Sequence, residues 1–309
     1  MKKIDLVIPV LNEFEVINEL LVQLGSVKTE LEMMKYEVGI NLVDDGSDKE
    51  FKDILIGLKE NFDFRILELS RNYGQQIALK AGIENSEADA VVCLDADLQD
   101  PPELIIDMVK HWEDGYDVVH TIRSKREKES LTKKITANLF YRILDSNSKV
   151  KLTRNAGDFK LISKKIVDII KNSNDDDLYL RGLVDWYGGN KKFIYYDRNP
   201  RYAGKRKYKY KQSFDLAING LISYSDFLPN LLLRLLFFAI VVLIFLFAFL
   251  TYSFVNYSND LVRGWSSIVA ILIFSVIIQV TGFFFVVIYL KKITNQTSGK
   301  KGYTISKIV

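Results

Sequence analysis

The first 115 residues alternate between short apolar runs and segments with helical periodicity. Apolar runs of strand length occupy residues 4–11, 37–47, 64–70 and 89–97, and polar residues follow each run. Between them, residues 14–24, 49–62 and 74–85 space their apolar side chains as an amphipathic helix does, and residues 101–115 form a fourth such segment that opens on proline. Strands that alternate with helices predict an α/β domain with a mostly parallel, twisted sheet and helices on both faces.

Polar turns stand at three of the predicted strand ends, at residues 9–13, 44–47 and 95–99. The carboxyl ends of parallel strands meet along one rim of the sheet, and ligands of open α/β sheets bind outside that rim. We therefore expect these three turns to converge on one binding site.

The turn after the fourth strand holds two acidic residues, Asp95 and Asp97, one residue apart. In an extended segment, residues i and i+2 point the same way, so both carboxylates face one spot. Two like charges this close repel each other unless a positive group lies beside them, and a divalent cation with oxygen ligands satisfies this need.

The segment DDGS after the second strand is by itself most often a plain turn. As an alternative, Asp44 and Asp45 can hydrogen-bond a nucleoside. Neither of the glycine-rich phosphate fingerprints, G-x-G-x-x-G or G-x-x-x-x-G-K-[ST], follows a strand in this sequence. Phosphate binding therefore requires another group, such as a metal ion held by Asp97 that neutralises a diphosphate.

Two long runs, residues 235–255 and 264–290, contain no Asp, Glu, Lys or Arg. About 20 apolar residues in a helix cross a bilayer, so each run is long enough to span it. The alternative is a pair of buried core helices, but a run that is apolar on every face favours the membrane. The lysine-rich tail after the second run indicates a cytoplasmic C-terminus, and two crossings place the N-terminal domain in the cytoplasm as well.

The formal net charge of +3 is too small to indicate a nucleic-acid partner. Positive charge is nevertheless concentrated in the segments RSKREK and RYAGKRKYKYK, which favours a phosphate group or an anionic surface as their partner. Residues 131–144 and 213–229 are amphipathic and can lie on an anionic membrane or pack on the domain. The single cysteine, Cys93, lies in an apolar run and is expected to be structural.

These patterns divide the chain into four parts. We predict a cytoplasmic α/β domain at 1–212, an interfacial amphipathic segment at 213–230, two transmembrane helices within 231–290 (about 231–255 and 264–290), and a cytoplasmic basic tail at 291–309. The expected location is the plasma (inner) membrane.

Seven segments, in order, resemble the family 2 glycosyltransferases with a GT-A fold, and more narrowly the polyprenyl-phosphate glycosyltransferases related to dolichol-phosphate mannose synthase. The segments are VIPVLNE, LVDDGSDKE, LSRNYGQQIALKAGI, VVCLDADLQDPPELI, GDFKLISKK, LRGLVDWYGG and RYAGKRKYKYKQS, and the two apolar runs follow them. The resemblance covers nearly the whole chain and implies a GT-A (Rossmann-like) catalytic domain followed by a two-helix transmembrane hairpin.

The resemblance also implies roles for individual residues. Residues expected to contact the nucleotide are Pro9, Leu11, Asn12, Glu13, Val43, Asp44, Asp95 and Ala96. The expected ligands of Mg²⁺ or Mn²⁺ are Asp95, Asp97 and Gln99. Basic positions expected to grip diphosphate or lipid phosphate are Arg123, Arg126, Arg201 and Lys207, and Asp158 matches an acid of the acceptor site.

The chain departs from the family pattern at two of these motifs. Leu11 replaces an aromatic residue of the first turn, which puts stacking on the base in doubt, and GKRKY carries an added arginine. Because a lipid phosphate is already an anionic nucleophile at neutral pH, we expect Asp158 to position the acceptor or contact the metal rather than act mainly as a general base.

The resemblance implies an inverting, metal-dependent transfer of one hexose from a UDP- or GDP-sugar to a polyprenyl (undecaprenyl-type) phosphate. It places the protein in the lipid bilayer and implies a homo-oligomer, since related enzymes can form tetramers. The alternatives are a membrane-anchored transferase that uses a glycan or diphospholipid acceptor, and a catalytically silent lipid-carrier scaffold.

Overall fold

The computed structural model describes residues 1–124, 153, 156–173, 184–185, 187–200, 202, 227–256, 265–297 and 302–309. The chain forms two compact units. The first unit comprises residues 1–224 together with 301–309, and the second comprises residues 225–300.

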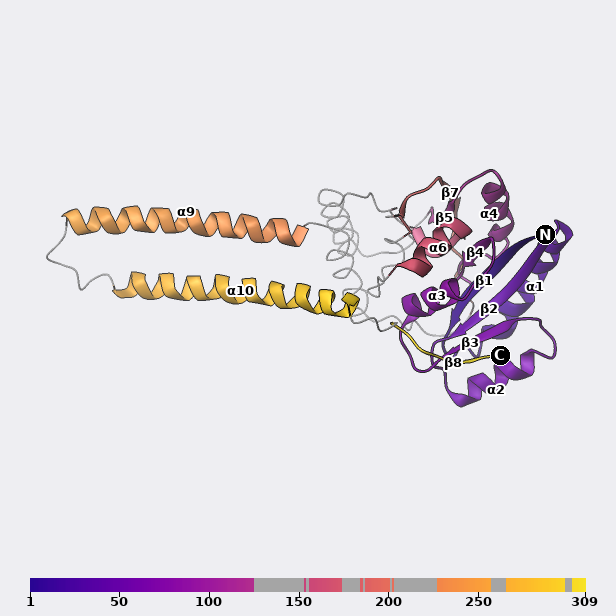
Figure 1. The fold of residues 1–309 in the computed structure, drawn as a ribbon. Helices are drawn as coiled ribbons and strands as arrows, with labels where there is room; N and C mark the ends of the chain where they lie inside the picture. Colours follow the sequence, from indigo (N-terminus) through magenta and orange to yellow (C-terminus); the bar gives the residue numbers. More distant parts are fainter. Residues whose placement is uncertain are drawn as a thin grey trace. The chain divides into compact units, whose positions relative to one another are not determined.

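The first unit contains one sheet with helices on its faces (Figure 1). Its strands are β1 (Lys2–Val10), β2 (Tyr36–Asp44), β3 (Arg65–Leu69), β4 (Ala90–Cys93), β5 (Val118–Arg123), β6 (Ala156–Ser163), β7 (Lys191–Tyr196) and β8 (Ile305–Ile308). Its helices are α1 (Ile17–Met33), α2 (Lys49–Leu58), α3 (Gln75–Glu84), α4 (Leu104–Glu113) and α6 (Lys164–Asn172).

The eight strands follow the order β7-β5-β6-β4-β1-β2-β3-β8. The pairs β1–β2, β1–β4, β2–β3 and β5–β7 are parallel, while β6 runs antiparallel to β4 and β5, and β8 runs antiparallel to β3. The predicted mostly parallel α/β sheet is therefore confirmed. All four strands and four helices expected in residues 1–115 are present, and α1 extends further than the predicted residues 14–24.

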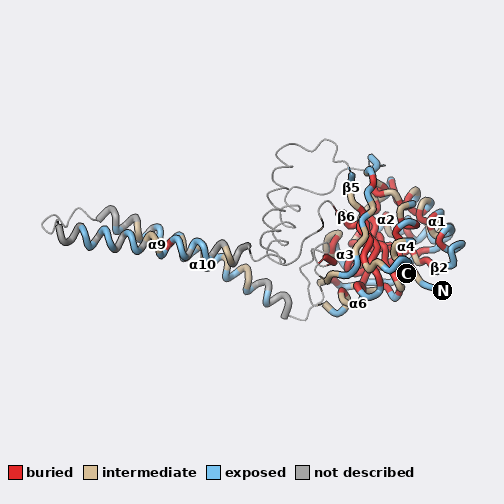
Figure 2. Tube along the Cα trace, turned by 90° about the horizontal axis from the view of Figure 1, so that it is seen from above, coloured by how far each residue is buried: buried red, intermediate tan, exposed pale blue. Residues whose placement is uncertain are grey.

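The core has two layers, one on each face of the sheet. Alternate side chains of the strands pack against α1, α2 and α4 on one face and against α3 and α6 on the other. Most residues of β1 and β2 and all residues of β4 are buried, because helices cover both faces of these strands. Figure 2 shows the buried residues gathered in the middle of the first unit. This packing fixes the ends of β1, β2 and β4, from which the three polar turns emerge.

The C-terminal strand β8 extends the sheet beyond β3, and the sequence pattern did not predict it. Ile66 and Val309 exchange two backbone hydrogen bonds of 2.9 Å, and the Ser70 amide donates to the Thr304 carbonyl. Tyr303, which is 5% exposed, donates its hydroxyl to Glu84 and accepts a hydrogen bond from Asn85. The chain end is thus an integral part of the first unit.

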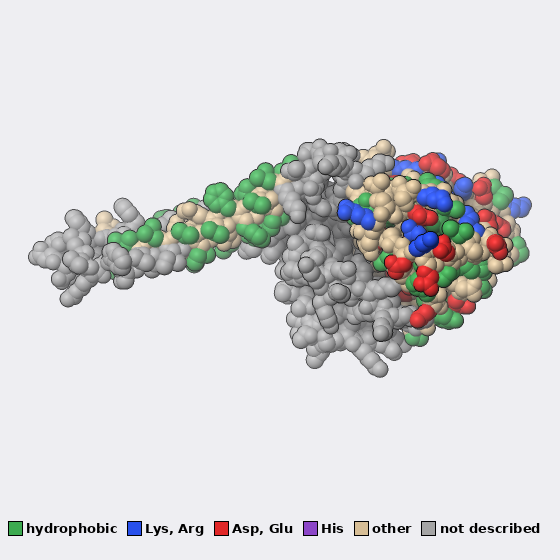
Figure 3. Space-filling model, turned by 90° about the horizontal axis from the view of Figure 1, so that it is seen from below, with side chains coloured by type: hydrophobic (Ala, Val, Ile, Leu, Met, Phe, Trp, Pro, Cys, Tyr) green, Lys and Arg blue, Asp and Glu red, His purple; other side chains and the backbone are tan. Residues whose placement is uncertain are grey.

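The second unit consists of α9 (Phe227–Asn256) and α10 (Trp265–Thr297), of 30 and 33 residues. Large apolar side chains of both helices are exposed, among them Phe237, Phe245, Phe283 and Phe284 at 62% or more, and Figure 3 shows hydrophobic side chains along the unit. Judged on the residues that the structure describes, no helix is long and apolar enough to cross a membrane. The transmembrane hairpin therefore stays a prediction.

Candidate active site

The first two polar turns, after β1 and β2, are joined to each other by Asn12. Its backbone amide donates to Ser47 Oγ (3.0 Å), its side-chain amide donates to Asp48 Oδ2 (2.9 Å), and its Oδ1 accepts from the Asp48 amide (2.9 Å). Asn12 has a positive φ of 50°, a conformation that asparagine tolerates better than most residues. The two turns that are expected to contact the nucleotide are therefore joined by hydrogen bonds at the rim of the sheet.

The other expected nucleotide-contacting residues lie at the same rim. Pro9 and Val43 are buried partners in the β1–β2 register, whereas Leu11 and Glu13 are half-buried in the turn. The Asp44 carboxylate is fully buried, accepts a hydrogen bond from the Ser47 amide (3.0 Å) and lies 3.5 Å from Lys52 Nζ.

Asp45, the residue after Asp44, stabilises a different turn. Its two carboxylate oxygens accept hydrogen bonds from the backbone amides of Tyr73 (2.7 Å) and Gly74 (2.9 Å), at the start of α3. Burial raises the pKa of Asp45, and these two amide donors oppose the rise without cancelling it. Asp45 thus fixes the loop that leads from β3 into α3.

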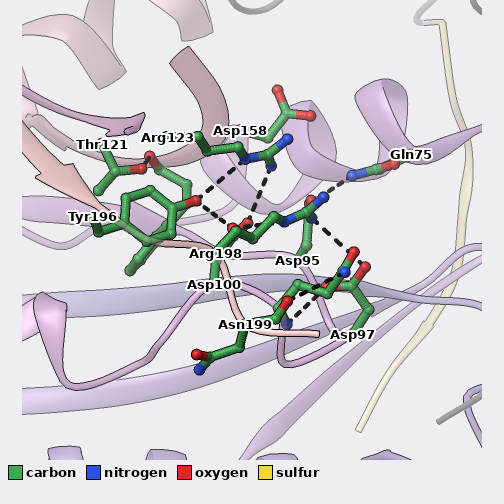
Figure 4. A network of polar contacts seen from close by, with 12 residues as sticks. Gln75, Asp95, Asp97, Asp100, Thr121, Arg123, Asp158, Tyr196, Arg198 and Asn199 are labelled. Carbon is green, nitrogen blue, oxygen red and sulfur yellow. Dashed lines mark hydrogen bonds and ion pairs between the residues drawn. The ribbon is translucent and has the colours of Figure 1, made fainter. Parts of the chain in front are cut away.

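Asp95 and Asp97 follow β4 in the third turn, with buried Ala96 between them (Figure 4). Asp95 Oδ1 accepts a hydrogen bond of 2.6 Å from the Gln75 side chain. Asp97 Oδ1 accepts from the Gln99 backbone amide (3.2 Å), and Asp97 Oδ2 lies 3.7 Å from an Arg198 guanidinium nitrogen. The Gln99 side-chain amide in turn donates to the Asn199 carbonyl (3.4 Å).

Asp100 anchors two arginines at the edge of this turn, and the sequence analysis missed it. Its carboxylate is fully buried and accepts hydrogen bonds from Arg123 (3.4 Å), Arg198 (3.1 Å) and the Tyr196 hydroxyl (Figure 4). Burial, the largest single effect, acts to lower the pKa of Arg123, but Asp100, Tyr196 and Asp95 together outweigh it and the pKa is raised. Asp100 therefore fixes two basic side chains beside the acidic turn.

Asp158 lies in β6 and is 1% exposed. The antiparallel register pairs Val92 with Leu161 and Cys93 with Lys160. Continued by two residues, this register sets Asp158 opposite Asp95, and directly opposite side chains point to the same face of a sheet. The Gln76 side chain donates to Asp158 Oδ2 at 2.9 Å.

The structure thus brings together, at one rim, the expected residues of the three turns with Arg123 and Asp158. Arg126, Arg201 and Lys207 lie outside the described residues. Gln75, Gln76, Asp100, Tyr196 and Arg198 join the site without having been predicted. A signal for four of them was present. Gln75 and Gln76 belong to LSRNYGQQIALKAGI, Asp100 belongs to DADLQDPPE, and Arg198 precedes the basic stretch RYAGKRKYKYK.

Within the described ranges, no three His, Cys, Asp or Glu side chains are grouped so that they could hold a metal ion. A magnesium site often uses only one or two carboxylates and completes its shell with water and substrate phosphates. Asp95, Asp97 and the Gln99 side chain supply oxygen donors of this kind. Arg198 lies beside Asp97, so positive charge is paired with this turn.

Comparison with known proteins gives a consistent result. Residues 5–170 match the model of Glycosyl transferase family 2. An uncharacterized glycosyltransferase of Synechocystis is 38% identical over 224 residues, which is 72% of this chain and 70% of that protein. The uncharacterized glycosyltransferase YkcC of Bacillus subtilis is 35% identical over 283 residues, covering 89% of this chain and 84% of YkcC.

A third relative matches over almost its whole length. The prophage bactoprenol glucosyl transferase homolog of Escherichia coli is 31% identical over 308 residues, 99% of each chain. Among solved structures, S. aureus TarS 1-349 in complex with UDP-GlcNAc has a TM-score of 0.45 at 17% identity, covering 69% of this chain and 61% of that chain.

Proposed function

Because the chain belongs to glycosyl transferase family 2, and is therefore a glycosyltransferase with a GT-A fold, we propose that it transfers one hexose from a UDP- or GDP-sugar to a polyprenyl phosphate. The observation that carries this proposal is the match over 99% of both chains to a protein named for glucosyl transfer and bactoprenol. That name favours glucose as the hexose and an undecaprenyl-type lipid as the acceptor.

The rim of the sheet suits the donor half of this reaction. In the transfer, the bond between the anomeric carbon and the nucleotide diphosphate breaks, and negative charge grows on the departing diphosphate. Arg123 and Arg198, both held by Asp100, present fixed positive charge at the acidic turn and can stabilise that charge. Asp95, Asp97 and Gln99 would hold Mg²⁺ or Mn²⁺, which supplies Lewis-acid stabilisation of the same leaving group.

The acceptor half places little demand on a general base. A phosphate monoester has its second pKa near roughly 6, so its oxygen attacks the anomeric carbon as an anion at neutral pH. The attack is a single in-line displacement that inverts the anomeric centre. Asp158, buried and hydrogen-bonded by Gln76, orients the reacting groups in this scheme rather than removing a proton.

We also propose that α9 and α10 form the membrane hairpin and that the first unit lies on the cytoplasmic side. The lysine-rich tail supports the cytoplasmic side, and two observations support the hairpin. The helices expose large apolar side chains that water solvates poorly. In addition, the first unit contains chain from both before and after the hairpin, so both ends of the hairpin belong on one side.

A donor and acceptor screen tests the proposal. Membranes that contain the protein are incubated with Mg²⁺ or Mn²⁺, polyprenyl phosphate and labelled UDP-glucose, UDP-galactose, UDP-N-acetylglucosamine or GDP-mannose. We expect label in a product that is extractable into organic solvent and labile to mild acid. Label found only in glycan or diphospholipid would favour a different acceptor, and no transfer from any donor would favour a silent scaffold.

A further inference from the structure

Helix α3 begins with two glutamines that reach two different acidic residues of the active site. Gln75 Nε2 donates to Asp95 Oδ1 at 2.6 Å, and Gln76 Nε2 donates to Asp158 Oδ2 at 2.9 Å. We propose that Gln75 and Gln76 are positioning residues for the transfer reaction, which hold these two carboxylates in their working orientations. This inference rests on the proposed function and assigns it two further residues.

The two carboxylates need such donors because of where the strands place them. Continued by two residues beyond its last pair, Cys93 and Lys160, the β4–β6 register brings Asp95 and Asp158 opposite each other. Both lie near enough to Cys93 for their charges to raise the pKa of its thiol, which burial raises most. Two facing carboxylates repel each other, and hydrogen-bond donors offset that repulsion. The Gln75 and Gln76 side chains supply one donor to each carboxylate and fix its orientation.

An amide is well matched to this task. A lysine or arginine in its place would neutralise the carboxylates and compete with a bound cation for their charge. An amide donates a hydrogen bond without carrying charge and without titrating. The first turn of α3 adds the partial positive charge of a helix N-terminus on the same side.

The position of α3 is fixed, so the two amides are pre-organised. Asp45 binds the Tyr73 and Gly74 amides just before the helix, and Gly74 has a φ of 98° that favours glycine. Further along, a Cβ atom on Gly82 would lie only 2.2 Å from Val7 Cγ1, so α3 packs directly on the sheet. The contacts at Gly74 and at Gly82 therefore restrict movement of the Gln75 and Gln76 side-chain amides.

Burial of Gln76 argues against a purely structural role. Gln76 is 8% exposed, and its Oε1 has no hydrogen-bond partner within the part of the chain that the structure describes. A buried polar atom without a partner costs stability, so an apolar side chain would fill the same volume at lower cost. The donor group of the amide, directed at Asp158, accounts for a polar residue at this position.

The test uses full-length protein in membranes and the variants Gln76→Met and Gln75→Met, which keep most of the side-chain volume but remove the donor. For Gln76→Met we expect kcat to fall by about 10- to 100-fold with little change in KM for the nucleotide sugar, since orientation of reacting groups is lost. For Gln75→Met we expect nucleotide binding, measured calorimetrically, to require a several-fold higher Mg²⁺ or Mn²⁺ concentration.

Ile77→Met is the matched control, because it changes α3 at the next position without touching a carboxylate, and it should keep wild-type kcat and metal dependence. If Gln76→Met fails to fold, Gln76→Leu replaces it, since its side chain also lacks a donor. Wild-type kcat in the folded Gln76 variant, together with unchanged metal dependence in Gln75→Met, would overturn the inference. Wild-type protein that transfers no sugar at all would instead contradict the proposed function.

Discussion

At the scale of single residues, Asp97 in the acidic turn and Asp100 at the edge of that turn have different surroundings. Asp100 is fully buried and binds Tyr196 and two arginines. The Asp97 side chain is 14% exposed and has Arg198 at 3.7 Å. A buried acid with several donors stabilises the local fold, whereas a partly exposed acid at the rim is available to a ligand that brings positive charge.

Asp97→Asn tests this distinction directly. We expect transfer to fall by at least about 100-fold, because an amide binds a divalent cation far more weakly than a carboxylate and the leaving diphosphate loses stabilisation. The measurement is initial rate against metal concentration with the donor identified in the screen. The variant should still insert and fold, as judged by expression and thermal unfolding, and wild-type turnover would remove Asp97 from the metal site.

His120 provides a prediction about acid stability. The side chain is 1% exposed, its Nε2 lies 3.3 Å from Asp185 Oδ1, and its ring stacks on Phe193. Burial is the largest cause of its lowered pKa, and the charges of Lys160 and Lys191 act the same way, while Asp185 opposes them. His120 is therefore neutral in the folded protein at neutral pH.

A lowered pKa means that the unfolded chain binds the proton first. The contribution of His120 to stability is then fully present above its unfolded pKa of about 6.5 and decreases as the pH falls below it, by at most about 1.4 kcal/mol per pH unit. Unfolding midpoints between pH 7.5 and 5.5 should thus decline less in His120→Gln than in wild type. His111→Gln, which removes the other histidine, serves as the control and should retain the wild-type decline.

At the scale of elements, the sequence predicts the fold well where periodicity is strong. The four strands and four helices of residues 1–115 were predicted because buried parallel strands are continuous apolar runs and their helices are amphipathic. β8 was not predicted, since ISKI is short and its pairing partner, β3, lies more than 230 residues earlier. Its place depends on a tertiary contact that no local pattern reveals.

Contacts within the candidate active site were likewise only partly predictable from local sequence patterns. The acidic pair and the turn around Asn12 follow strand ends and were expected from the sequence. Gln75, Gln76 and Arg198 acquire their roles through contacts with residues 20, 82 and 98 to 101 positions away, which only the folded chain establishes. Local spacing identified the carboxylates of the site but not the groups that hold them.

Tyr303 tests whether β8 is needed for the stability of the first unit. Truncation of a buried aromatic side chain costs about 3–5 kcal/mol, so Tyr303→Ala should lower the thermal unfolding midpoint markedly. Lys307→Ala, on an exposed position of the same strand, should change stability by no more than about 0.5 kcal/mol. Equal midpoints for the two variants would show that β8 contributes little.

At the scale of the whole molecule, the order of the two units along the chain constrains the topology of the protein in a membrane. The catalytic sheet is completed by the residues that follow α10, so the second unit is an insertion between two parts of the first. If α9 and α10 cross a membrane, the connection at residues 257–264 must lie on the side opposite to both α2 and β8. That both lie on one side is independent of the charge of the tail, whereas the assignment of that side to the cytoplasm rests on the lysines of the tail.

Cysteine labelling in membrane vesicles tests that orientation. The only native cysteine, Cys93, is fully buried with its thiol pKa raised to about 12, so a membrane-impermeant maleimide should leave the wild type unlabelled. Glu50→Cys and Lys307→Cys should react only in inside-out vesicles, and Asn259→Cys only in right-side-out vesicles. Labelling of all three from one side would contradict the hairpin, because no bilayer would then separate the connection from the catalytic unit.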